Sequence, residues 1–295
     1  MLEEYKVYKK IRDCINIRLI FFSVIAYAIG AGLVSYIGRG IDLHILLLGL
    51  IIVILFRLST DSLSCFFNLS ETYNKKRSPN LTLLRNSLLI LSLSLLTIGA
   101  ILSVLLYSRA KSSLVLWVFL GIFFIILILS AIPPFFLNKK GYGGFFATIS
   151  IVALAPSFAY ILQINELHNT LFLITFPAFF LLLAYFLAQS LENYFEDNKN
   201  QNHTLMTVLG WKLGMRIHNY FVLLTYLLYG LASIFGLSGI LTLPAWFSLP
   251  IAGIQFWEMW RIGEGYKPRW KLLKLSSLGS ISVLAYFYIF ILWLR

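Results

Sequence analysis

The segment that decides the fold is "HILLLGLIIVILFRLSTDSLSCFFNLSETYNKKRS", residues 44–78. Its first part, 44–67, is apolar and has Arg57 and Asp61 as its charged residues. A run of about 20 apolar residues is long enough to cross the hydrocarbon core of a bilayer as a helix. The run then stops, and an amide, a hydroxyl, a carboxylate and three cations follow. The segment predicts a membrane helix whose polar end is either an interfacial border or a binding site for a charged ligand.

Apolar blocks of this kind recur along all 295 residues. The chain is 59% hydrophobic and only 12% charged, against about 25% charged residues in a soluble domain, and its mean hydropathy is +0.84. The blocks predict nine transmembrane helices, at 18–37, 44–67, 84–107, 113–137, 144–164, 170–191, 217–238, 241–260 and 273–294. We expect an all-α integral membrane protein with one domain over 1–295. The charged lead-in 1–17 lacks the features of a cleavable signal peptide.

The basic residues divide unequally between the two sides of these spans. With the N-terminus inside, 19 of the 24 Lys and Arg residues fall on the inner side, four fall on the outer side, and Arg57 lies within a span. Cytoplasmic loops carry the excess of Lys and Arg in membrane proteins. We therefore expect a plasma-membrane protein with a cytoplasmic N-terminus and an outer C-terminus. This orientation also explains the net charge of +12 without a nucleic-acid partner.

Polar side chains form a stripe along the second span. Arg57 and Asp61 are four residues apart, and Ser64 and Asn68 continue the same helical face. Ionisable groups inside a membrane are expensive, so they pair with one another and often mark a substrate path. Two interpretations stay open, a polar path leading to Asn68 or an ion pair that holds helices together.

The sixth span ends in a second polar stretch, "YFLAQSLENYFEDNKNQNHTLMTVLGW", residues 185–211. Gln189, then Glu192 or Asn193, then Glu196 or Asp197 recur at helical spacing, which places their oxygens on one face of a helix end. The alternative is a solvated loop beyond about residue 194. The stretch also repeats the Asn, Glu and Asn-Lys order of 68–76, as expected for a site between two halves of a bundle.

Carboxylate and amide oxygens suit Mg²⁺, and nearby Lys and Arg suit phosphate groups. The cations expected to bind a diphosphate on the inner face are Lys75, Lys76, Arg77, Lys139, Lys140 and Lys199. A lipid diphosphate fits this arrangement, with its head group at the cytoplasmic rim and its isoprenoid tail between apolar helices. Two cysteines, Cys14 and Cys65, show no disulfide or metal-binding pattern, and the four histidines are expected to be structural or solvated.

These motifs resemble those of the UbiA superfamily of intramembrane prenyltransferases, and the layout is most similar to the branch that prenylates 1,4-dihydroxy-2-naphthoate for menaquinone synthesis. The family's N-D-x-x-D motif corresponds to "NLSET", 68–72, and its N-D-x-x-D-x-x-x-D motif to "QSLENYFED", 189–197. "NKKGYGGF", 138–145, resembles the family's basic glycine-containing link. Leu69 and Thr72 stand where the family has aspartates, and a register shifted by one turn is also possible for the second motif.

The resemblance implies a nine-helix bundle around a central cavity that opens to the cytoplasmic side. It implies a Mg²⁺-dependent transfer of an isoprenoid chain from a polyprenyl diphosphate to an aromatic or other lipid acceptor. The residues expected to act in catalysis and metal binding are Asn68, Glu71, Asn193 and Asp197, with Arg57, Asp61, Gln189, Glu192 and Glu196 in support. The alternatives are a family member that binds a polyprenyl lipid without catalysis and an unrelated multi-span transporter.

Overall fold

The computed structural model describes residues 15–75, 79–109, 114–133, 135, 137 and 140–294, with the backbone alone at 70–75, 79–81 and 108–109. Nine helices in these residues are long and apolar enough to cross a membrane, which confirms the predicted all-α membrane fold. The spans are α2 (Ile17–Tyr36), α3 (Leu43–Lys75), α4 (Pro79–Arg109), α5 (Leu114–Ala131), the segment Gly143–Ile164, α8 (Asn169–Leu191), α11 (Trp211–Ile234), α12 (Gly239–Gly263) and α13 (Trp270–Trp293).

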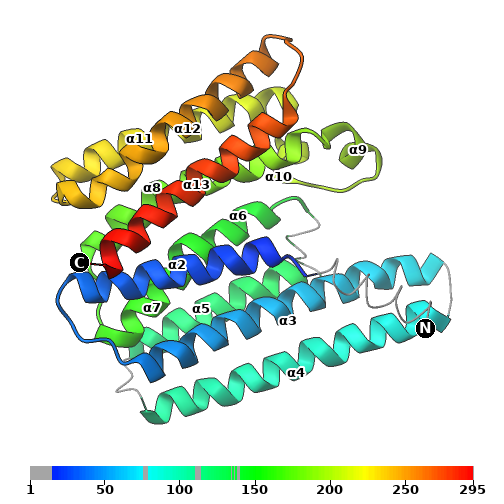
Figure 1. Cartoon of the computed structure of the whole chain (residues 1–295). Helices are drawn as coiled ribbons and strands as arrows, with labels where there is room; N and C mark the ends of the chain where they lie inside the picture. Colours follow the sequence, from blue (N-terminus) through cyan, green and yellow to red (C-terminus); the bar gives the residue numbers. More distant parts are fainter. Residues whose placement is uncertain are drawn as a thin grey trace.

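Helices α3 and α4 form the longest hairpin and extend along one edge of the molecule (Figure 1). α3 has 33 residues, and a rise of 1.5 Å per residue makes such a helix about 50 Å long. It therefore continues beyond the apolar run that ends near residue 67, because the polar border contains no helix breaker before Lys75. Pro79 opens α4, where the missing N–H of proline costs no helical hydrogen bond.

The fifth span is not one regular α-helix. It consists of α6 (Gly143–Thr148), the π-helical turn η1 (Ile149–Leu154) and α7 (Ala155–Ile164). Pro156 stands at the start of α7, and proline cannot donate the backbone hydrogen bond of a continuous helix. Turns of the π type often occur beside functional sites. η1 packs against α2 and α8 in this molecule.

The sixth span ends at Leu191, and the chain turns before the short helices α9 (Tyr194–Lys199) and α10 (Leu205–Leu209). The expectation that one helical face continues from Gln189 to Asp197 is therefore wrong. The solvated-loop alternative is also incomplete, because both short helices lie in this connection. Thr204 caps α10 by accepting a hydrogen bond from the backbone N–H of Thr207 at 3.2 Å.

The ends of α3, α8 and α12 meet the starts of α4, α6, α11 and α13 on the right in Figure 1. This end includes the segments with most of the Lys and Arg residues, and we call it the basic end. The main pairings are α3 with α4, α8 with α11, and α12 with α13. Large apolar side chains such as Ile90, Leu114 and Ile234 remain exposed on the outside. Such a surface is suited to lipid rather than to water.

Candidate functional site

A polar cavity of about 530 Å³ lies at the basic end. Its walls come from segments that are far apart in sequence, namely α3, the starts of α2 and α6, the end of α8 and the residues that lead into α10. The side chains and glycines that line it are Asn16, Leu19, Arg57, Asp61, Ser64, Cys65, Asn68, Gly141, Gly143, Gly144, Ala147, Phe186, Ser190, His203, Thr204 and Leu205.

One wall of this cavity is the polar stripe of α3. Arg57, Asp61, Ser64 and Asn68 all line it, because residues spaced by three or four positions share a helical face. The structure thus brings these four residues together as the spacing in the sequence indicates. Arg57 is buried, Asp61 is partly buried, and Asn68 is exposed at the cavity's outer edge.

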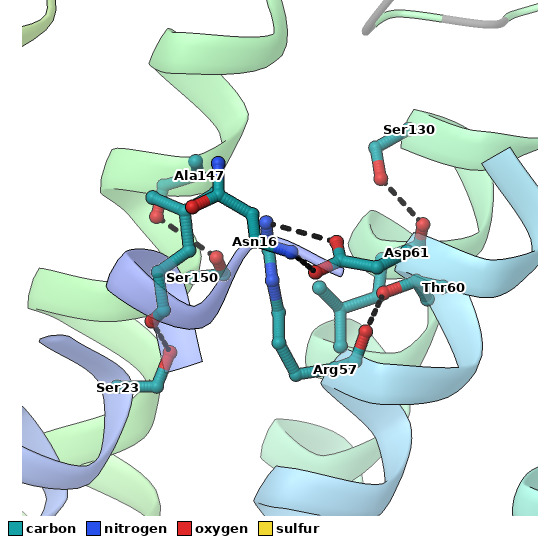
Figure 2. A network of polar contacts seen from close by, with 10 residues as sticks. Asn16, Ser23, Arg57, Thr60, Asp61, Ser130, Ala147 and Ser150 are labelled. Carbon is teal, nitrogen blue, oxygen red and sulfur yellow. Dashed lines mark hydrogen bonds and ion pairs between the residues drawn. The ribbon is translucent and has the colours of Figure 1, made fainter. Parts of the chain in front are cut away.

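Arg57 and Asp61 also form the ion pair of the second interpretation. The Arg57 Nη2 atom lies 3.3 Å from Asp61 Oδ1, and the backbone N–H of Asn16 donates to Asp61 Oδ2 at 3.2 Å. Figure 2 shows the backbone nitrogen of Asn16 and the side chain of Arg57 both directed at this carboxylate. The Arg57 Nε atom is buried without a hydrogen-bond partner among the described residues. A guanidinium has five N–H donors, so Arg57 keeps donors for a ligand in the cavity.

Glycines at the start of α6 allow two other walls to approach each other. Gly141 has φ +89°, which favours glycine, and a Cβ there would lie 2.9 Å from the carbonyl oxygen of Thr204. A Cβ on Gly144 would lie 3.2 Å from Cγ of Phe186 on α8. Lys140 and His203 form an isolated β-bridge beside this contact. The close approach therefore brings His203 and Thr204 to the cavity.

His203, Thr204 and Asn16 were not expected at the site. A single histidine without a second one nearby gave no signal of its own, and Asn16 lies in the predicted lead-in. The usable signal was the pair of motifs "GYGGF", 141–145, and "TLMTVLG", 204–210, whose glycine and helix-capping residues meet in the structure. Ser190 lies within the segment 189–197 and was not predicted as a site residue, yet it lines the cavity.

Two residues predicted to support the site face another helix. The Gln189 Nε2 atom donates to the Lys274 carbonyl and to the Ser277 hydroxyl of α13, both at 3.1 Å. Glu192 forms an ion pair with Lys274. Since each residue turns a helix by about 100°, Phe186 and Ser190 face the cavity while Gln189 faces α13. The expectation that Gln189 and Glu192 belong to the polar face of the site is wrong.

The residues predicted on α9 do not line the polar cavity either. Asn193 precedes α9 and is exposed, as are Glu196 and Lys199, and Asp197 is half-buried. The turn after Leu191 ends the face that Ser190 occupies, so the expected shared cavity of Asn68, Asn193 and Asp197 is not observed. Lys140 is exposed at its bridge with His203 and does not line the cavity.

Several predicted residues lie outside the described part of the chain. Lys76, Arg77 and Lys139 are not described, and for Glu71 and Lys75 the structure gives only the helical backbone. The expectation that the cysteines form no disulfide is wrong, since the sulfur of Cys65 is disulfide-bonded, and Cys65 lines the cavity. Cys14, the other cysteine of the sequence, is outside the described residues.

The described residues do not form the magnesium site that the motifs suggest. Among them, no group of three His, Cys, Asp or Glu side chains is placed to hold a metal ion. Asp61 is the one carboxylate among the described residues that line the cavity, and it already binds Arg57 and Asn16. Mg²⁺ demands nearly octahedral oxygen coordination, and this donor set, in which hydroxyls, amides and a cation predominate, does not fit it.

A second, apolar cavity continues deeper along the same helices. It lies among α2, η1, α8 and α13, between residues such as Ile25, Val152, Ala178 and Ile281. Phe22 and Tyr185, whose rings meet edge to face at 5.5 Å, belong to the apolar cluster between the two cavities. The molecule therefore offers a polar compartment at the basic end and an apolar one below it.

These features define an integral membrane protein in which a polar cavity at the basic end lies next to an apolar one. A family model described as the UbiA prenyltransferase family matches residues 19–278. The chain belongs to this family, as its motifs suggested. A transporter unrelated to the family is thereby set aside.

The fold is also similar to a solved structure of a digeranylgeranylglyceryl phosphate synthase. The TM-score is 0.64 at 18% sequence identity, and the match covers 98% of each chain. At this identity the similarity supports the arrangement of the helices and says nothing about the acceptor. A comparison with curated proteins finds no match.

Proposed function

We propose that this chain transfers an isoprenoid group from a polyprenyl diphosphate to an acceptor within the membrane. The observation that carries the proposal is the pair of cavities. The polar cavity at the basic end suits the diphosphate, and the apolar cavity along α2, η1 and α8, of about 80 Å³, suits the first part of the isoprenoid tail. Phe22 and Tyr185 pack in the apolar cluster beside the two cavities, and we expect their side chains to move when a tail enters from the polar side.

The diphosphate contacts proposed for this site differ in part from those read from the motifs. Arg57 supplies charge from inside the cavity, and Ser64, Ser190 and Thr204 supply hydroxyl donors. A charged donor to phosphate makes a stronger hydrogen bond than a neutral one. The proposed outer contacts remain the cations from the sequence, namely Lys75, Lys76, Arg77, Lys139, Lys140 and Lys199.

The proposed reaction breaks the bond between the allylic carbon and the diphosphate oxygen, and the electron pair leaves with the diphosphate. The allylic cation then forms a carbon–carbon bond with an electron-rich acceptor ring, and that ring carbon loses its proton. Groups that stabilise the departing negative charge accelerate such a step, and we propose Arg57 for this role because it lines the polar cavity. We propose an aromatic acceptor such as 1,4-dihydroxy-2-naphthoate, as in menaquinone synthesis.

A second candidate function is binding of a polyprenyl lipid without transfer. One observation favours it, namely that the single carboxylate among the described lining residues is occupied by Arg57 and Asn16. Glu71, Asn193 and Asp197 remain proposed catalytic and metal-binding residues only if they reach the ligand when it is bound. The two functions predict the same affinity for the donor and different turnover.

The test uses purified protein in lipid nanodiscs with a radiolabelled polyprenyl diphosphate and dihydroxynaphthoate, in Mg²⁺ and in EDTA. Donor binding and diphosphate release are measured separately. We expect saturable binding in the wild type, and binding that is weaker by roughly tenfold in Arg57→Gln because one charged phosphate contact is lost. Arg39→Gln, at the opposite end of α2, is the matched control and should bind normally.

The outcomes separate the candidates. Release of diphosphate together with a prenylated product supports transfer. Binding without release, across a panel of aromatic and lipid acceptors, supports the lipid-binding function. Donor affinity equal to the wild type in Arg57→Gln contradicts the proposed role of this cavity, and an absence of donor binding contradicts both functions.

A further inference from the structure

A second polar cavity, of about 480 Å³, lies at the basic end between the start of α11 and the end of α12. It shares no lining residue with the cavity described above. Its volume falls within the range of about 300–1,000 Å³ that is typical of small-molecule sites. The lining residues that matter are Trp211, Lys212, Arg216, Asn219, Trp260 and Glu264.

Among the described residues, no ion pair balances the cations of this cavity, although Lys212 Nζ lies 5.3 Å from the centre of the Trp211 ring. Lys212 and Arg216 are four residues apart on α11 and both line the cavity, and like charges at this spacing repel each other. Neither is within ion-pair distance of a carboxylate in the described part of the chain, whereas Arg261 and Arg269 nearby both bind Glu258. Glu264 is on the α12 side, so the cavity carries two cations and one carboxylate.

The same face of α11 changes from polar to apolar with depth. Leu223 and Leu227 follow Arg216 at seven and eleven positions, so they lie on the same helical face, and both are more than half exposed. Trp211 and Trp260 flank the cavity and are partly exposed, as is typical of tryptophans at a membrane interface. A ligand that fits this surface has an anionic head and long apolar chains.

We propose that this cavity binds the head group of an anionic phospholipid. The phosphodiester lies between Lys212 and Arg216, the head-group hydroxyls donate to Glu264 and the acyl chains follow Leu223 and Leu227. Basic pockets between transmembrane helices at the cytoplasmic face suit such head groups. This site is separate from the proposed prenyl-transfer cavity, so the lipid-binding proposal does not depend on the proposed prenyl transfer.

The test is native mass spectrometry of the purified full-length protein in mixed micelles that contain phosphatidylglycerol or phosphatidylcholine. We expect retained phosphatidylglycerol on the wild type, and retention weaker by roughly 30-fold in Lys212→Gln/Arg216→Gln, because two phosphate contacts are lost. The matched control is Lys267→Gln/Lys271→Gln, which removes the same charge at the same end outside the cavity. It should retain the lipid as the wild type does.

Three results overturn the proposal. If phosphatidylglycerol and phosphatidylcholine are retained equally, the site has no preference for an anionic lipid. If both double variants lose phosphatidylglycerol to the same extent, the lipid is held by the overall positive charge of this end and not by the cavity. Displacement of the lipid by millimolar inorganic phosphate shows a site for a free anion. If the double variant does not fold, single Lys212→Gln and Arg216→Gln variants, checked by size-exclusion profile, give the same comparison.

Discussion

At the scale of single residues, the Arg57–Asp61 pair decides what the polar cavity can do. Both side chains are about 9% exposed, and removal of one partner of a buried ion pair leaves an uncompensated charge. Breaking the pair therefore has a structural cost. We propose that Arg57, whose Nε atom has no hydrogen-bond partner among the described residues, also contacts the ligand.

We predict that Asp61→Asn lowers the free energy of unfolding by about 3 kcal/mol, because it leaves the buried guanidinium without its counter-charge. The double variant Arg57→Gln/Asp61→Asn should be more stable than the sum of the single effects predicts, by about 1–3 kcal/mol. Unfolding in mixed detergent micelles, followed by circular dichroism, measures both. The half-exposed pair Glu192–Lys274 is the control, and Glu192→Gln should cost less than about 1 kcal/mol. If the losses of unfolding free energy in the two single variants simply add in the double variant, Arg57 and Asp61 are not energetically coupled.

At the scale of the elements, the close contact of α2 with α7 holds the first and fifth spans together. A Cβ on Gly30 would overlap the backbone of Pro156, including its carbonyl oxygen. Small residues allow this kind of approach between membrane helices. Since backbone atoms cannot rotate away as a side chain can, the position accepts only glycine without a shift of one helix.

We predict that Gly30→Ala destabilises the protein by about 1–3 kcal/mol, as overpacking of a filled interior does. The control is Gly230→Ala on α11, where a Cβ meets nothing within 4 Å. That change should be neutral or stabilising by up to about 1 kcal/mol, because alanine favours a helix. Thermal unfolding midpoints of the two variants in one detergent give the comparison. A Gly30→Ala protein as stable as Gly230→Ala would show that α2 and α7 separate easily.

At the scale of the whole molecule, the division of Lys and Arg in the sequence sets the expected orientation, with 19 residues expected on the inner side and four on the outer side. The candidate site is at the basic end, so the orientation decides from which side a donor arrives. The cytoplasmic loops of membrane proteins contain an excess of Lys and Arg. We therefore propose that the cavity opens to the cytoplasm.

We predict that an epitope tag on the C-terminus is cleaved by an external protease on intact cells, and that a tag on the N-terminus is cleaved only after permeabilisation. The physical reason is the odd number of spans in the described residues, which puts the two termini on opposite sides, together with the basic bias. Immunoblots for both tags provide the measurement, with a cytoplasmic protein as the leakage control. If the external protease cleaves only the N-terminal tag, the orientation in the membrane is the opposite of the predicted one.

Much of the fold and part of the site followed from local rules. The nine spans, the helical character and the stripe from Arg57 to Asn68 depend on apolar length and on a period of 3.6 residues, which are properties of short segments. The sequence by itself therefore determined the membrane fold and the α3 wall of the cavity, and the resemblance of its motifs pointed to the family that the family model shows. The stretch 68–78, with which the apolar run ends, continues as helix to Lys75.

Only the tertiary structure decided how the other walls meet. Gln189 and Ser190 are neighbours in sequence, yet one bonds to α13 and the other faces the cavity, because helix rotation and the position of α13 select the direction. The helix end at Leu191 has no glycine or proline to mark it, and it removes Asp197 from the shared face. His203 reaches the cavity through a contact with the Gly141 segment about 60 residues away. Such contacts depend on packing between distant segments, which a local pattern does not contain.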